Sequence, residues 1–86
     1  MVFAVFSIGP DAAIEAVRTQ VIRISNGWQQ ISRGVWLMGN AATEDILRDH
    51  LGRYGAQVVV IRLQGNWASQ GFPQLAEWLQ AAQNYF

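Results

Sequence analysis

A single histidine and a few grouped carboxylates are the side chains of this chain that could do acid–base or metal chemistry. His50 stands beside Asp49 on a predicted helix. It could be a general base or a metal ligand, but we favour a partly exposed histidine near a helix C-terminus, where positive charge is stabilised. Asp11 and Glu15 are four residues apart and could share a hard cation. We favour the simpler interpretation that acids gather at a helix start because of the helix dipole.

Motifs for nucleophilic attack or phosphate binding are not recognisable. Ser7 ends an extended run, but the G-x-S-x-G spacing of a nucleophile elbow is not present around it. The segment from Ser7 to Pro10 has one glycine, and Pro10 lacks the N–H that a phosphate-binding loop would donate. The chain has no cysteine, which excludes disulfides, thiolate catalysis and cysteine zinc sites. We therefore assign no catalytic residue, metal ligand or cofactor, with Ser7 and Asp11 as the nearest catalytic candidates.

Composition favours an interaction protein over a strong nucleic-acid binder. The 86 residues are enough for one domain, 51% of them are hydrophobic and only 14% are charged, against about 25% charged in ordinary domains. Apolar surface that remains after one core is filled usually marks an interface. The formal net charge is zero and all six basic residues are arginine, so the chain does not have the basic surplus typical of nucleic-acid binders.

Three arginines are the candidates for a local nucleic-acid contact: Arg18, Arg33 and Arg62. Arg18 lies on the first predicted helix and Arg33 in a predicted hairpin. Arg62 lies on the last predicted strand, where it faces the same side as Val58 and Val60. It could contact phosphate, pair across an interface, or hold its charged head in water near the sheet edge; the sequence leaves these alternatives open.

Two segments are apolar on both sides of a strand. Residues 2–8 place Val2, Ala4, Phe6 and Ile8 on one face of the strand and Phe3, Val5 and Ser7 on the other. Residues 57–63 oppose Val58 and Val60 to Val59, Ile61 and Leu63. Both faces of the sheet then need cover, and a chain of this length has few elements to supply it. We therefore predict a homodimer, with an interface drawn from Phe3, Val5, Ser7, Val59, Ile61 and Leu63.

Helical spacing, caps and turn residues predict the remaining elements. They are a helix over about 10–22, strands over 30–32 and 35–38, a helix capped by Thr43, a strand over about 56–64 and a C-terminal helix over about 73–84. Arg33 and Gly34 predict a tight turn or a bulge. This order is the ferredoxin-like βαββαβ plan, so we expect one α+β domain over residues 1–86 with an antiparallel four-stranded sheet and an extra C-terminal helix.

The ferredoxin-like plan leaves one face of the sheet open. Right-handed crossovers place the first two helices on the same face. The other face is then available to the C-terminal helix or to a second subunit.

The second helix and the loop before the last helix carry finer predictions. A buried stripe is expected at Ile46, Leu47, Leu51 and Tyr54. Ion pairs with i,i+4 spacing are expected between Glu44 and Arg48 and between Asp49 and Arg53. Trp67 and Phe72 flank the loop before the last helix, and we expect them to pack against the body of the protein rather than stack on bases.

The N-terminal apolar run does not resemble a targeting segment. No basic residue precedes it, and Gly9 and Pro10 interrupt it after about eight residues, well short of a membrane span. We expect a cytoplasmic protein without a membrane partner.

Several segments together resemble the small SinR-like proteins. They are residues 28–32 (WQQIS), 35–37 (VWL), 43–51 (TEDILRDHL), 58–63 (VVVIRL) and 65–72 (GNWASQGF). These proteins belong to the superfamily of the small CRISPR-associated integration-complex subunit and virulence-associated protein D. The resemblance implies a ferredoxin-like fold and a homodimer packed through sheet faces. It also implies metal-dependent ribonuclease or deoxyribonuclease activity in some relatives, where an Asp from each subunit ends the first strand. Here that segment reads Phe6-Ser7-Ile8-Gly9, without an acid.

These observations give one leading hypothesis and two alternatives. The leading hypothesis is a small homodimeric binding or interaction protein without the strand-end Asp. One alternative is a divalent-metal endonuclease, toxin-like or CRISPR-associated, which would require Mg²⁺. The other is a nucleic-acid-binding module without catalysis.

Overall fold

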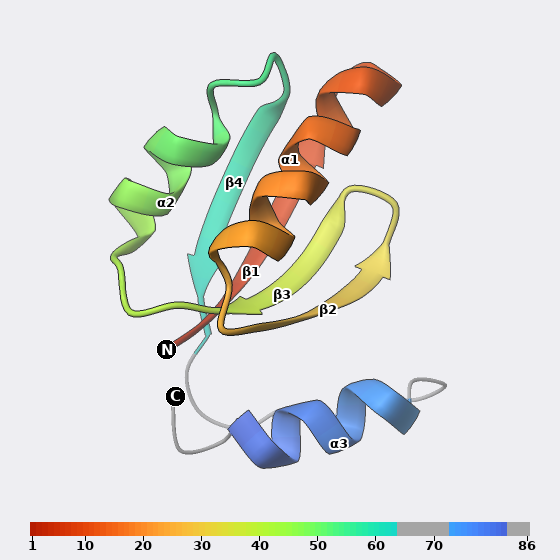
Figure 1. The fold of residues 1–86 in the computed structure, drawn as a ribbon, viewed down its shortest axis with the longest axis vertical. Helices are drawn as coiled ribbons and strands as arrows, with labels where there is room; N and C mark the ends of the chain where they lie inside the picture. The colour runs from red at the N-terminus through yellow and green to blue at the C-terminus, as the bar shows by residue number, and fades with distance from the viewer. Residues whose placement is uncertain (64–72, 83–86) are drawn as a thin grey trace.

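One antiparallel sheet, with strand order β2-β3-β1-β4, organises the computed structural model (Figure 1). The structure describes residues 1–63 and 73–82. Its elements are β1 (Val2–Ile8), α1 (Asp11–Ile24), β2 (Gly27–Ser32), β3 (Val35–Gly39), α2 (Glu44–Leu51), β4 (Gln57–Arg62) and α3 (Pro73–Ala82). This order and topology confirm the predicted α+β ferredoxin-like fold with an additional C-terminal helix.

β1 lies between β3 and β4 and sets the register of the sheet. Phe3 stands opposite Met38 of β3 and Arg62 of β4. Phe6 stands opposite Val35 and Val59. β2 and β4 are the edge strands of the sheet. β1, whose sequence is apolar on both faces, therefore has a strand on each side, as β3 does.

The main core lies between one face of the sheet and helices α1 and α2. In Figure 1, α1 lies in front of the sheet and α2 lies beside β4. The strands contribute Phe3, Val5, Trp36 and Met38, all fully buried. The helices contribute Val17, Val21, Leu47 and Leu51 at helical spacing. Because side chains alternate along a strand, the even-numbered residues of β1 must point to the opposite face.

Helix α3 covers part of that opposite face. Leu79 is buried there against Ala4 and Leu37, and Ile31, Leu63 and Trp78 pack around them. The expectation that the C-terminal helix takes some of the face left open by α1 and α2 is therefore met. Residues 83 and 84, included in the predicted helix, lie outside the described part of the chain.

Several predicted boundaries move by a few residues. α1 begins at Asp11, directly after Pro10, and continues to Ile24. β2 begins at Gly27, three residues earlier than predicted, and has an irregular register between Gln30 and Ser32. Pairing with β3 extends the strand back to Gly27, which stands opposite Gly39.

The predicted helix cap and hairpin turn are present. The Thr43 hydroxyl accepts a hydrogen bond from the backbone N–H of Ile46 at 3.4 Å, as expected of a helix N-cap. Arg33 and Gly34 form the tight turn between β2 and β3.

Two predictions about α2 are wrong. Ile46 was expected in the buried stripe, but its residue is 59% exposed, because the short helix turns only Leu47 and Leu51 fully into the core. Arg48 pairs with Asp45 and Asp49 rather than with Glu44. The loop that contains Trp67 and Phe72 lies outside the described residues. Among the helices of residues 1–63 and 73–82, none has the length and apolar character needed to cross a bilayer.

Candidate functional site

Ser7, near the end of β1, is hydrogen-bonded to the β2–β3 turn. It is 6% exposed. Its hydroxyl donates to the carbonyl oxygen of Gly34 at 3.2 Å, and its backbone N–H donates to the same oxygen at 2.7 Å. Burial and a backbone carbonyl acceptor are what a structural hydroxyl is expected to have.

Gly34 is the residue that permits this close contact. Its φ is +78°, a conformation that side chains with a Cβ adopt only at a cost. A Cβ at Gly34 would also lie 2.6 Å from the carbonyl oxygen of Ser7. The turn and the end of β1 are therefore packed backbone against backbone.

Asp11, the second catalytic candidate, lies in the first turn of α1 and forms an ion pair with Arg33. Both side chains are largely exposed, so the pair contributes little to stability. Within residues 1–63 and 73–82, no three His, Cys, Asp or Glu side chains are grouped as a metal site. The structure thus places Asp11 next to a cation of its own chain, at the same end of the sheet as Ser7.

His50 joins α2 to α1. One ring nitrogen, Nε2, lies 3.0 Å from Oε1 of Gln20, and the ring meets Tyr54 edge-on at 6.5 Å between centroids. These contacts agree with the favoured interpretation of a packed, partly exposed helical histidine.

The three candidate arginines do not form one patch. Arg18 stacks over the ring of Trp28 at 5.9 Å, and Arg33 pairs with Asp11. Arg62 lies on the opposite edge strand and in register with Phe3. Arg33 lies in the turn that contacts Ser7, and Arg62 lies opposite Phe3. Ser7 and Phe3 are four residues apart on β1, which corresponds to about 13 Å along the strand.

The six interface candidates lie on different faces of the sheet. Phe3 and Val5 are fully buried beneath α1 and α2, and Ser7 is buried at the hairpin. Val59 and Ile61 point to the opposite face and are exposed, while Leu63 packs with the Leu79 cluster. Sequence alternation identified the two faces correctly, but it carried no signal for which face the helices would cover.

An exposed apolar cluster occupies the part of the open face that α3 leaves uncovered. Its members are Phe6 (39% exposed), Ile8 (69%), Val59 (55%) and Ile61 (47%), here called the open-face patch. Phe6 and Val59 are direct register partners on adjacent antiparallel strands. Ile8 and Ile61 lie two residues further along their own strands and therefore flank this pair on opposite sides. Four exposed large apolar side chains on neighbouring strands form a surface suited to protein contact.

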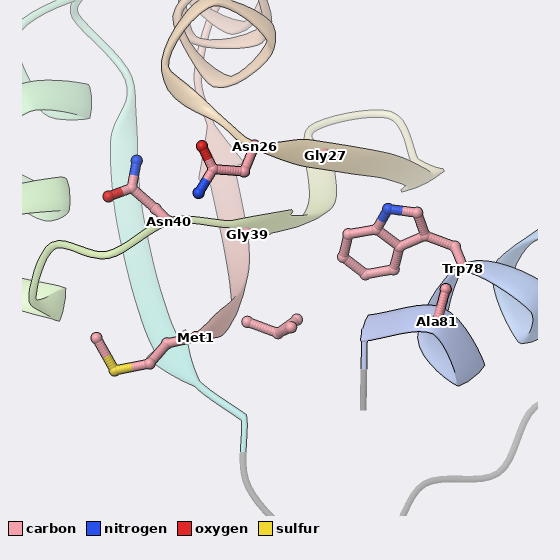
Figure 2. A pocket seen from close by; sticks show the side chains of 8 residues that line it. Met1, Asn26, Gly27, Gly39, Asn40, Trp78 and Ala81 are labelled. Atoms are coloured by element: carbon pink, nitrogen blue, oxygen red, sulfur yellow. The ribbon is translucent and has the colours of Figure 1, made fainter. Parts of the chain in front are cut away.

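A pocket of about 370 Å³ lies at the other end of the sheet, where β1 begins (Figure 2). The sheet side is formed by Met1, Val2, Asn26, Gly27, Gly39 and Asn40. Trp78 and Ala81 of α3 form the opposite wall. Sequence reasoning did not identify this pocket, because its walls come from segments up to 80 residues apart.

Comparison with known protein families, curated proteins and solved structures gives no significant match for this chain. The resemblance to the SinR-like proteins therefore stays a prediction from the sequence segments that suggested it.

Proposed function

We propose that this chain is a small interaction protein that self-associates through its open-face patch. The observation that carries the proposal is the exposure of Phe6, Ile8, Val59 and Ile61 on the sheet face opposite α1 and α2. Leaving side chains of this size in water is unfavourable by about 25 cal/mol for each Å² of apolar surface. A partner that covers them recovers this free energy.

A second copy of the same chain is the partner that fits the patch best. The patch contains no charged side chain and the chain has no net charge, so nothing in it selects a strongly charged partner. A two-fold axis through the patch would bring it against itself, apolar surface on apolar surface. In that arrangement the α3 helices of both copies border the contact, because each covers the neighbouring part of its own face.

The size of the patch points to moderate affinity. Stable interfaces use about 20–30 residues from each partner, and the patch has four. Surrounding surface, including Val35 opposite Phe6 and the outer side of α3, must therefore join the contact. We expect a monomer–dimer equilibrium in the micromolar range.

Sedimentation equilibrium of matched variants tests this proposal. Ile8→Glu places a carboxylate in the patch and should weaken association by about tenfold or more, because an unpaired charge would be buried. Ile46→Glu makes the same change at a similarly exposed isoleucine on α2, outside the patch. It should leave the association constant unchanged.

Two results would count against the proposal. A wild-type chain that remains monomeric throughout the micromolar range would exclude self-association at the expected strength. Equal weakening by Ile8→Glu and Ile46→Glu would move the interface away from the open-face patch.

The two nucleic-acid alternatives have less support. The resemblance implies an acid at the end of the first strand, whereas this chain has Ser7 there, with its hydroxyl hydrogen-bonded to the Gly34 carbonyl. The candidate arginines lie apart, two of them engaged by Trp28 and Asp11. Both alternatives predict salt-dependent binding of RNA or DNA, which a titration with labelled oligonucleotides at two ionic strengths would detect.

A further inference from the structure

Two glycines create the pocket at the end of the sheet. Gly27 and Gly39 face each other in the β2–β3 register, so neither strand places a side chain there. A Cβ at Gly27 would lie 3.0 Å from Nε1 of Trp78, closer than ordinary packing allows. Figure 2 shows the Trp78 ring extending from α3 toward these two strand ends. The glycine at position 27 thus allows an indole to form a wall of the pocket.

Two asparagine amides are the hydrogen-bonding side chains of the pocket besides the Trp78 indole. Asn40 is held in place by two hydrogen bonds: its Nδ2 donates to the carbonyl of Ile24 at 2.8 Å, and its Oδ1 accepts from the N–H of Ala42 at 2.7 Å. An amide nitrogen has two donors and an amide oxygen accepts twice, so each atom has one bonding position left. Asn26, at the junction of α1 and β2, adds a second, exposed amide.

We propose that this pocket binds a small uncharged molecule that combines a flat aromatic ring with a carboxamide-type edge. The indole of Trp78 offers a surface for ring stacking, and the exposed amide of Asn26 offers the donor and acceptor that an amide edge matches. No acidic or basic side chain lines the pocket, so the lining side chains offer no ion pair that would offset the lost hydration of a charged ligand. Its volume of about 370 Å³ lies at the low end of the range for small-molecule sites, about 300–1,000 Å³.

Nucleobases and free nicotinamide both combine a flat aromatic ring with an amide-type edge, so either could supply the ligand. The proposal does not depend on self-association, because none of the four residues of the open-face patch lines the pocket. A monomeric protein that binds such a ring would refute the proposed function and leave this inference intact.

Titration of the ¹⁵N-labelled full chain, followed by NMR, tests the inference. Nicotinamide, uridine and adenosine serve as probes, and cyclohexanecarboxamide serves as the control that keeps the amide but has no aromatic plane. We expect saturable shifts of the amides of Gly27, Gly39 and Asn40 and of the Trp78 indole N–H. Saturation by nicotinamide alone or by the nucleosides alone identifies the source of the ligand.

Three variants define the contacts. Asn26→Ala removes an exposed amide, and Trp78→Leu keeps an apolar side chain but removes the ring. Each should weaken binding by about fivefold or more, the usual effect of one lost hydrogen bond or stacking contact. Gln57→Ala removes an exposed amide at the far end of the sheet and should leave affinity unchanged. If Trp78→Leu detaches α3 from the sheet, the affinity of Asn26→Ala tests whether the pocket binds the probe.

Three outcomes would overturn the inference. No saturable shift at millimolar concentrations of any probe would show that the pocket has no ligand of this class. Equal binding of cyclohexanecarboxamide would remove the aromatic requirement. Shifts centred on Phe6, Ile8, Val59 and Ile61 would show that the probes adsorb to the open-face patch instead.

Discussion

At the scale of single residues, the structure gives Ser7 a partner that the sequence did not indicate. The sequence named Ser7 as one of the nearest catalytic candidates because of its place near the end of the first strand. In the structure Ser7 is buried, and its hydroxyl donates a hydrogen bond to the carbonyl of Gly34, 27 positions along the chain. Nothing local to Ser7 indicates that partner, since the contact exists only after β1 and the β2–β3 hairpin have come together.

Replacing Ser7 should affect stability. Ser7→Ala removes the hydroxyl hydrogen bond but keeps the backbone bond to the same carbonyl. We expect the free energy of unfolding to fall by about 1 kcal/mol, measured by urea denaturation. Ser32→Ala makes the same change at an exposed residue of β2 and should have almost no effect; an equal loss in both variants would contradict the role assigned to Ser7.

Gly34 should tolerate substitution less well than Gly39. Gly34→Ala must adopt a positive φ and place its Cβ 2.6 Å from the Ser7 oxygen, so a loss of about 2 kcal/mol or more is expected. Gly39→Ala meets only ordinary contacts, the nearest at 3.8 Å. Thermal unfolding of the two variants should rank Gly34→Ala as clearly less stable, and the reverse order would refute the geometry of the turn.

At the scale of elements, alternation along β1 and β4 predicted that both sheet faces are apolar. The order of strands and helices then predicted which kind of sheet they build, and both predictions agree with the structure. The sequence could not assign α1 and α2 to the face of Phe3 and Val5 rather than that of Phe6 and Ile8, because both sets are equally apolar. The interface list therefore mixed residues of the two faces.

Helix α3 should depend on Leu79 for its position. Leu79→Ala removes the side chain buried against Ala4 and Leu37, which should lower the free energy of unfolding by about 2 kcal/mol. Gln80→Ala, one position along and exposed, is the control. Hydrogen exchange measures the result: faster exchange of α3 amides in Leu79→Ala alone is expected, and unchanged exchange would show that Leu79 does not hold the helix.

At the scale of the whole molecule, two different surfaces lie along β1. The open-face patch extends from Ile8 at the end of β1 to Ile61 opposite Ala4, and the pocket lined by amides and Trp78 lies at the start of β1. The neutral, apolar composition predicted leftover surface of this kind. Composition could not show where this surface lies, because the position of α3 determines which part of the open face is covered.

Self-association through an uncharged patch should not weaken with salt. Ion pairs lose strength as salt screens them, whereas burial of apolar surface does not depend on that screening. We expect the dimerisation constant, followed by light scattering, to stay constant or rise from low to high NaCl. A steep fall would indicate that arginine–carboxylate pairs hold the copies together.

The most direct test of the central claim is an isotope-filtered NOE experiment on a mixture of ¹³C-labelled and unlabelled chains. It detects only contacts between different copies. The account predicts intermolecular contacts from the side chains of Phe6, Ile8, Val59 and Ile61. Contacts that arise instead from Ile46 and its helix, or none at concentrations well above the micromolar range, would contradict it.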